Sequence, residues 1–243
     1  MMPQISSVIE RRLLVNYRVE PEVAARLLPA PLRPQLVGDW AVAGICLVRL
    51  GQVRPVGLPG SIGVRSENAA HRIAVEWDGP DGVEKGVYIP QRDSGSSLNV
   101  LLGGRLFPGV HSLARFDVKE SQHDLHVAFT SQDNTTQVSV DVRTVDEFDG
   151  SELFPDLATA SEFFRQGSVG FSASRDGHRL DGLELNTAKW QVRPAHTHAV
   201  QSTYFEDQTR FPSGSATLDC TLLMRDVPAT WRVTAPMQMP AMA

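Results

Sequence analysis

Apolar and polar residues alternate along much of the chain, which is the pattern of β-strands. In RLLVNYRV, Leu13, Val15, Tyr17 and Val19 fall on one side, and the residues between them fall on the other. Similar segments are mostly bounded by Gly, Pro, Asp or Asn. They cover residues 40–50, 71–77, 86–90, 112–118, 124–130, 136–145, 168–174, 183–192, 197–205 and 216–225. The pattern predicts a chain dominated by strands.

Three short stretches are predicted to form helices instead. EPEVAARLLPAPL has a proline suited to a first helical turn, apolar residues at helical spacing and a later proline that prevents continuation. SSLNVLLGG begins with capping serines and ends at glycines, and ATASEFFRQG ends at Gly167. Helices and strands do not alternate as in a doubly wound sheet. We therefore predict a mainly β (α+β) fold, an antiparallel barrel or sheet assembly with a few short helices at its rim.

The chain has 243 residues, of which 42% are hydrophobic and 21% charged. This composition can bury a full core. No low-complexity linker, charge run or fixed-period repeat divides the sequence. We expect one domain over residues 1–243, with residues 235–243 (APMQMPAMA) as a loose C-terminal tail.

Charge, hydropathy and cysteine content restrict the partners and the cellular compartment that we expect. The net charge is −5 and the arginines are scattered, which argues against a nucleic-acid surface. No apolar run is long enough to span a bilayer, and the N-terminus has no stretch suited to secretion. Cys46 and Cys220 lie far apart in apolar segments, as buried free thiols do. We expect a cytoplasmic protein with a small-molecule ligand and no membrane partner, and a homo-oligomer is left open.

The first candidate for chemistry is ENAAHRIAVEW. It places Glu67 just before a predicted strand and His71 on one face of that strand. Glu67 could act as a general acid or base if partial burial raised its pKa, and His71 could orient it or share the proton. A capping glutamate and a half-buried histidine explain the same residues without catalysis. Both interpretations stay open.

YIPQRDSGSSLNVLLGG joins a strand to a helix through Arg92, Asp93 and several serines. Asp93 or Ser94 is expected to cap the helix, which accounts for these polar residues structurally. The helix amides beside Arg92 could instead bind an anion such as a substrate carboxylate.

The stretch GGRLFPGVHSLARF follows. Two glycines end the helix, Arg105 comes next, and Pro108-Gly109 makes a turn before His111. Local sequence explains the turn but leaves open whether His111 is structural or faces a site.

Other chemistries lack support. HTH (His196, His198) and HDLH (His123, His126) offer histidine pairs without a third ligand at local spacing, so no metal is expected. The chain has no Gly-x-Ser-x-Gly elbow, phosphate loop or dinucleotide glycine signature. We expect no cofactor.

The order of these motifs resembles the acetoacetate decarboxylase superfamily, more particularly an uncharacterised bacterial branch of unknown function. LLVNYRVEPEVAARLLPAPL, the Glu67 segment and LNVLLGGRLFPGVH carry the resemblance, which covers about residues 10–118. It implies a β-barrel-cored fold with a buried pocket. It also places the family's active-site glutamate on Glu67 and its active-site arginine near Glu10, Arg11 and Arg12.

One departure from that family bears on mechanism. In the decarboxylases a lysine pair follows the aromatic-Pro turn, and one lysine forms a Schiff base with the substrate ketone. Here Gly109, Val110 and His111 follow the turn. A Schiff base needs a primary amine, so lysine-dependent decarboxylation from this position is not expected.

These observations predict a small-molecule pocket protein. The first hypothesis is an enzyme with lyase-like or isomerase-like acid/base chemistry on a small carbonyl or carboxylate compound. Glu67 and His111 would exchange protons, and His71 with Arg92 or Arg105 would bind the substrate. The alternative is a non-catalytic ligand-binding or assembly protein on the same fold.

Overall fold

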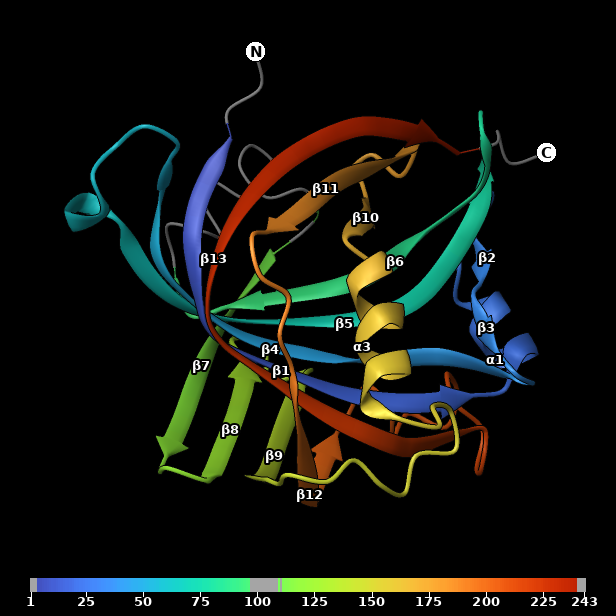
Figure 1. The fold of residues 1–243 in the computed structure, drawn as a ribbon. Coiled ribbons are helices and arrows are strands. Elements are labelled where there is room, and N and C mark those ends of the chain that lie inside the picture. The colour runs from blue at the N-terminus through green and yellow to red at the C-terminus, as the bar shows by residue number, and fades with distance from the viewer. Residues whose placement is uncertain (1–3, 97–108, 110, 240–243) are drawn as a thin grey trace.

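A computed structural model describes residues 4–96, 109 and 111–239, and strands dominate it (Figure 1). The strands are β1 (Ile5–Val19), β2 (Arg33–Pro34), β3 (Leu36–Val37), β4 (Trp40–Pro55), β5 (Val64–Gly79), β6 (Gly82–Ser94), β7 (His111–Glu120), β8 (Asp124–Ser131), β9 (Gln137–Thr144), β10 (Val169–Ala173), β11 (Arg179–Thr187), β12 (Arg193–Ser202) and β13 (Ala216–Gln238). Within the described residues the helical segments are α1 (Pro21–Arg26), the 3₁₀ turn η1 (Gly60–Ile62) and α3 (Leu157–Gln166). The prediction of a mainly β fold with a few short helices is confirmed.

All the strands belong to one mixed sheet. Their order is β11-β10-β6-β7-β8-β9-β12-β13-β1-β4-β5-β2, and β3 pairs with β4. Only the β10–β6 and β6–β7 pairings are parallel among the described residues. Two further pairings, β11–β13 and β6–β5, join strands that are far apart in this order. The sheet therefore curls back on itself twice, as Figure 1 shows, and is not a simple closed barrel.

The central strand β1 is buried on both faces, which its alternation alone does not predict. Leu13 and Val15 are fully buried on one face, and Leu14 and Asn16 are buried on the other. The Asn16 side-chain amide donates to the carbonyl oxygens of Leu14 (3.2 Å) and Cys220 (3.0 Å). These bonds satisfy a polar group that would otherwise be costly to bury. The central strands thus separate two interior compartments.

Two apolar clusters occupy these compartments. The first cluster lies on the Leu13 face and includes Leu47, Ala69 and Ile73. The second lies on the Leu14 face and includes Cys46 and Ala74 from the sheet, with Ala160 and Phe164 from α3. Figure 1 shows α3 lying across β1, β4 and β5. We use the terms first face and second face for these two sides of the central strands.

Two of the three predicted helices are present. α1 begins at Pro21, and α3 is capped by the Asp156 side chain, which accepts a hydrogen bond from the backbone of Thr159. α3 ends before Gly167, as the sequence predicts. The helix expected in SSLNVLLGG covers residues 96–104, of which all but Ser96 lie outside the described part. No helix in the described part is long and apolar enough to span a membrane.

The expectation of a loose tail from residue 235 is wrong for its first residues. β13 continues to Gln238, and its last residues pair with β11, Met237 opposite Leu180 and Gln238 opposite Arg179. The segment APMQ alternates too little to be recognised as a strand. Backbone pairing with β11 provides the order that its side chains do not predict.

Gly44 in β4 occupies a place with no room for a side chain. A Cβ there would overlap the carbonyl oxygen of Val15 and approach the Cα of Asn16 to 3.3 Å. We expect Gly44→Ala to lower the free energy of unfolding by about 2 kcal/mol, because neighbouring strands must shift to admit the methyl group. Urea unfolding measures this loss. Gly167→Ala, whose Cβ would make only ordinary contacts, is the control, and equal losses would contradict the explanation.

Candidate functional site

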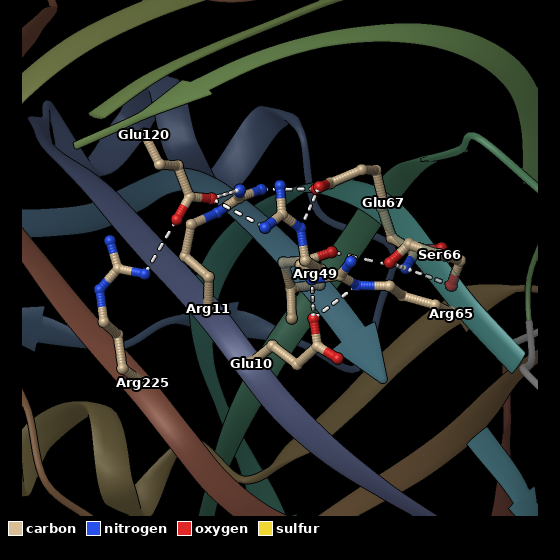
Figure 2. Close-up of polar contacts among 10 residues, drawn as sticks. Glu10, Arg11, Arg49, Arg65, Ser66, Glu67, Glu120 and Arg225 are labelled. Atoms are coloured by element: carbon tan, nitrogen blue, oxygen red, sulfur yellow. Dashed lines mark hydrogen bonds and ion pairs between the residues drawn. The ribbon is translucent and has the colours of Figure 1, made fainter. Parts of the chain in front are cut away.

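Charged side chains from five strands meet on the first face of the sheet (Figure 2). Arg225 of β13, Arg11 of β1, Arg49 of β4 and Glu67 of β5 are successive cross-strand neighbours. Glu120, the last residue of β7, completes the group. We call these five residues the arginine–glutamate cluster.

The ion pairs of this cluster are short. Arg11 contacts Glu67 at 2.5 Å through Nη2 and Glu120 at 2.5 Å through Nη1. Arg49 contacts the same two carboxylates at 2.5 and 3.1 Å, and Arg225 contacts Glu120 at 3.0 Å. The Arg11 side chain is only 1% exposed. Both oxygens of Glu67 are therefore bound to guanidinium groups, Oε2 to Arg11 and Oε1 to Arg49.

The cluster also lowers the pKa of Glu120. Burial favours a higher pKa for the Glu120 carboxyl, but hydrogen bonds from Arg11 and Arg225 and the charges of Arg11 and Arg49 lower its pKa below the usual value.

The resemblance placed the family's active-site arginine near Glu10, Arg11 and Arg12 without deciding the position. In the structure Arg11 binds Glu67, whereas Glu10 pairs with Arg65 at 2.6 Å.

A second group of polar residues lines a cavity on the second face. This cavity has a volume of about 60 Å³. Arg92 of β6 and His111 of β7 are register partners there, so their side chains share one side of the sheet. The lining residues are Val48, Leu50, Asn68, Ala69, Ala70, Arg92, Asp93, His111, Leu183 and Trp231. The cavity is thus mostly apolar with a few convergent polar groups, as small-molecule sites often are.

Arg92 is the cation of this cavity. Its Nε donates to the hydroxyl of Ser172 at 3.2 Å, and its buried Nη2 has no hydrogen-bond partner among the described residues. Burial lowers the pKa of Arg92 to about 10, so the side chain is still cationic at neutral pH. Gly109 has a φ of +96°, and a Cβ there would lie 2.7 Å from the Cβ of Ser172. Glycine therefore allows the backbone at position 109 to come close to the Arg92–Ser172 pair.

Asp93 or Ser94 was expected to cap a helix that falls outside the described residues, so this expectation stays a prediction; the Ser94 hydroxyl accepts a hydrogen bond from the backbone N–H of Ser96 at 3.2 Å, whereas Asp93 has other surroundings. It is 1% exposed, and its Oδ2 accepts a hydrogen bond from Gln91 at 3.3 Å. The buried Oδ1 has no hydrogen-bond partner among the described residues. Burial raises the pKa of Asp93 to about 7. The sequence did offer one indication of this position. Asp93 and Gln91 are two residues apart in β6, so their side chains lie on the same face of the sheet, the first face.

The family model described as an uncharacterised conserved protein, DUF2071, matches residues 8–224. The chain belongs to this family. No curated protein matches the chain significantly.

Solved structures share the fold of this DUF2071 protein at low sequence identity. Acetoacetate decarboxylase from Legionella pneumophila superposes with a TM-score of 0.61 at 10% identity, over 97% of this chain and 88% of that one. An acetoacetate decarboxylase-like enzyme from Sphingomonas wittichii gives 0.57 at 11% identity, over 98% and 93%. The enduracididine biosynthesis enzyme MppR complexed with pyruvate gives 0.58 at 12% identity, over 98% and 90%. The acetoacetate decarboxylase-like fold expected from the sequence is confirmed.

The DUF2071 chain brings together only some of the residues singled out from its sequence. Arg92 and His111 line one cavity on the second face, whereas Glu67 lies in the arginine–glutamate cluster on the first face. This geometry offers no direct proton exchange between Glu67 and His111. Glu67 also lies within β5 rather than at its entrance. Arg105 lies outside the described residues.

His71 is not at the cavity either. It is fully buried on the first face, and its ring stacks on Tyr204 with centroids 4.3 Å apart. Neither ring nitrogen has a hydrogen-bond partner among the described residues. Burial, with a smaller effect of the Arg210 charge, lowers the pKa of His71 to about 3. In this position His71 is a neutral member of an aromatic core and does not reach the cavity.

The three lysines of the DUF2071 chain, Lys85, Lys119 and Lys189, are all exposed. Lys85 faces Glu76 in the β5–β6 pairing, and Lys119 lies near the end of β7. None of the three lines the cavity that holds Arg92 and His111.

The histidine pairs noted in the sequence lie elsewhere on the sheet. His196 and His198 have ring centroids 5.1 Å apart, and the Nδ1 of His126 is 2.7 Å from a carboxylate oxygen of Asp141. Within residues 4–96, 109 and 111–239, no group of three or more His, Cys, Asp or Glu side chains is arranged to hold a metal ion.

Proposed function

We propose that this protein is an enzyme that performs acid/base chemistry on a small carbonyl or carboxylate compound. The reaction takes place in the cavity lined by Arg92 and His111, and it uses no Schiff-base lysine. The observation that carries the proposal is the buried Arg92 guanidinium. Its Nη2 group has no hydrogen-bond partner among the described residues. Arg92 also pairs in register with His111, whose imidazole lines the same cavity.

Arg92 is the substrate-binding group in this proposal. No Asp or Glu among the described residues forms an ion pair with it, and all Asp and Glu residues of the chain lie in the described part. A substrate carboxylate would supply the missing negative charge and accept the Nη2 hydrogen bond. The largely apolar lining lowers the local dielectric constant and so strengthens that interaction.

His111 is the proton-transfer group. Imidazole both gives and accepts a proton near neutral pH, as proton abstraction next to a carbonyl requires. The exposure of all three lysines supports chemistry without a Schiff base. Glu67 takes a positioning role in this scheme, because it anchors β5 to Arg11 and Arg49 while the next residue, Asn68, lines the cavity.

The relatives support a small substrate. MppR, which shares the fold, is described in complex with pyruvate and with the condensation product of pyruvate and imidazole 4-carboxaldehyde. A cavity of about 60 Å³ is suited to a compound with only a few heavy atoms.

The test is a screen of small 2-oxo and 3-oxo acids, with pyruvate first, by ligand-detected NMR for binding and for turnover. We expect Arg92→Met to weaken binding roughly 30-fold, since a charged hydrogen bond contributes about 2 kcal/mol. We expect His111→Asn to retain binding and to lose turnover by about 100-fold or more. Arg115→Met, an exposed residue of β7, is the matched control.

Each result separates the candidate functions. Turnover that survives His111→Asn unchanged would disprove its role in proton transfer. Binding that depends on Arg92, with no turnover of any compound in the wild type, would support the alternative, a non-catalytic ligand-binding protein. Binding that is unaffected by Arg92→Met would exclude the cavity as the site.

A further inference from the structure

A second pair of arginines lies on the second face, beneath α3. Arg12 comes from β1 and Arg72 from β5, and Arg72 is 4% exposed. No Asp or Glu among the described residues forms an ion pair with either side chain. The undescribed residues contain no Asp or Glu. A buried cation, Arg72, and a half-buried cation, Arg12, therefore lie next to each other without an acidic side chain to balance them.

The contacts that these arginines do make are neutral. The Arg72 guanidinium donates to the side-chain oxygen of Asn16 and lies over the ring of Phe164 at 4.9 Å. The Arg12 Nε donates to the sulfur of Cys46 at 3.3 Å, and its guanidinium lies over the ring of Trp190 at 5.5 Å. The Nε of Arg72 and the Nη1 of Arg12 are buried and have no hydrogen-bond partner among the described residues.

The Arg72 side chain carries its charge at neutral pH. Burial lowers the pKa of Arg72 to about 10, and the Arg12 charge acts in the same direction, yet this value is well above neutrality. The nearby thiol of Cys220 adds no negative charge, because burial raises its pKa to about 12. Cation–π contacts offset only part of the free-energy cost of desolvating two like charges. A buried anion would offset much more of it.

The space beside these groups is small. A cavity of about 10 Å³ is lined by both arginines, by Gln35 and by Phe163 and Phe164 of α3. That volume holds about one water-sized particle. It is too small for a phosphate or for an organic acid, and a halide ion, which is somewhat larger than a water molecule, enters only if the surrounding side chains shift slightly outward.

We propose that the pocket between Arg12 and Arg72 binds one small monovalent anion of the size of chloride. The anion accepts hydrogen bonds from the two unpartnered N–H groups and balances part of the buried positive charge. This site is separate from the cavity at Arg92 and His111, and it is independent of the proposed enzymatic function. Its role is to stabilise the packing of α3 on the central strands.

The test is urea unfolding of the full chain at constant ionic strength, with chloride or bromide replacing gluconate. Urea is used because guanidinium chloride would supply the anion. An anion that binds only the folded state lowers the unfolding equilibrium constant about 10-fold when its concentration is about ten times Kd. We expect this dependence in the wild type, in Arg92→Met and in Arg115→Met. We expect Arg72→Met to lose it.

A second measurement does not depend on a variant that folds. Crystals grown in bromide should give an anomalous peak between Arg12 and Arg72. The absence of a peak in bromide, together with a flat chloride response, would overturn the proposal. An equal response to sulfate would overturn the size argument. A chloride response that persists in Arg72→Met would place the anion elsewhere.

Discussion

Replacing Arg11 with methionine is expected to lower the free energy of unfolding by about 3 kcal/mol, because it leaves two carboxylates without their main partner. Arg11 contacts Glu67 and Glu120, each at 2.5 Å, and its side chain is 1% exposed. The two glutamates are 18% and 21% exposed, so water can stabilise them in part. The expected loss therefore lies at the low end for a broken buried ion pair. Urea unfolding at about pH 7 measures it.

A comparison with an exposed ion pair makes this prediction specific. Arg65→Met removes the partner of Glu10, but Arg65 is 63% exposed, and we expect a loss below about 1 kcal/mol. In Arg11→Met/Glu67→Gln, loss of the second charge should recover part of the stability. Similar losses for Arg11→Met and Arg65→Met would show that burial does not strengthen the arginine–glutamate cluster.

The acid side of the stability curve provides a further check on Arg11→Met. The folded-state pKa of Glu120 is lowered, so its contribution to stability is present above the unfolded value near 4.5 and is lost as pH falls through the folded pKa. Removing Arg11 takes away one of the hydrogen bonds that lower this pKa. The variant should therefore lose less stability than the wild type below about pH 4.5.

Replacing His71 with phenylalanine is expected to stabilise the protein, and more so in mild acid. The ring is fully buried, stacks on Tyr204 and has two nitrogens without hydrogen-bond partners among the described residues. Phenylalanine keeps the stacking and removes those nitrogens. We expect a gain of about 1 kcal/mol near pH 8, where His71 is neutral in both the folded and the unfolded state.

The pH dependence follows from the lowered pKa of His71, about 3 in the folded state. Between about pH 6.5 and pH 3 the unfolded state binds a proton that the folded state does not, so the wild type loses stability as pH falls. The loss is about 1.4 kcal/mol per pH unit, or about 2 kcal/mol between pH 6.5 and 5. Urea unfolding across this interval should give a flatter curve for His71→Phe.

The same variant separates a core role from a substrate-binding role for His71. His111→Asn is the comparison, because His111 lines the cavity and is not fully buried. If His71→Phe leaves ligand binding unchanged and removes the acid dependence, His71 belongs to the core. If it abolishes binding while stability stays as in the wild type, the original expectation for His71 stands.

The sequence predicted the elements better than the contacts between them. Alternation located most strands because a half-buried strand needs an apolar residue at every second position. It did not show that Asn16, on the apparently polar side of β1, would be buried. A strand covered on both faces depends on which segments pack against it, and these segments come from distant parts of the chain.

The candidate site shows the same limit. Resemblance placed an arginine near Glu67 to within a residue or two, and the structure shows contact through Arg11. Glu120 was not predicted, since it is 109 residues from Arg11 in sequence and no local pattern links them. The separation of Glu67 from His111 depends on strand pairing, which decides whether two side chains share a face.

The long last strand has a consequence for how the protein folds during synthesis. β13 pairs with β1 and β12 along its first part and with β11 along its second part. The ribosome makes β13 after all twelve other strands, so β1 leaves the exit tunnel long before its partner β13 is made. Early strands must wait with unpaired backbone edges, which are prone to aggregation. Completion of this fold is therefore a late event that depends on residues 216–238.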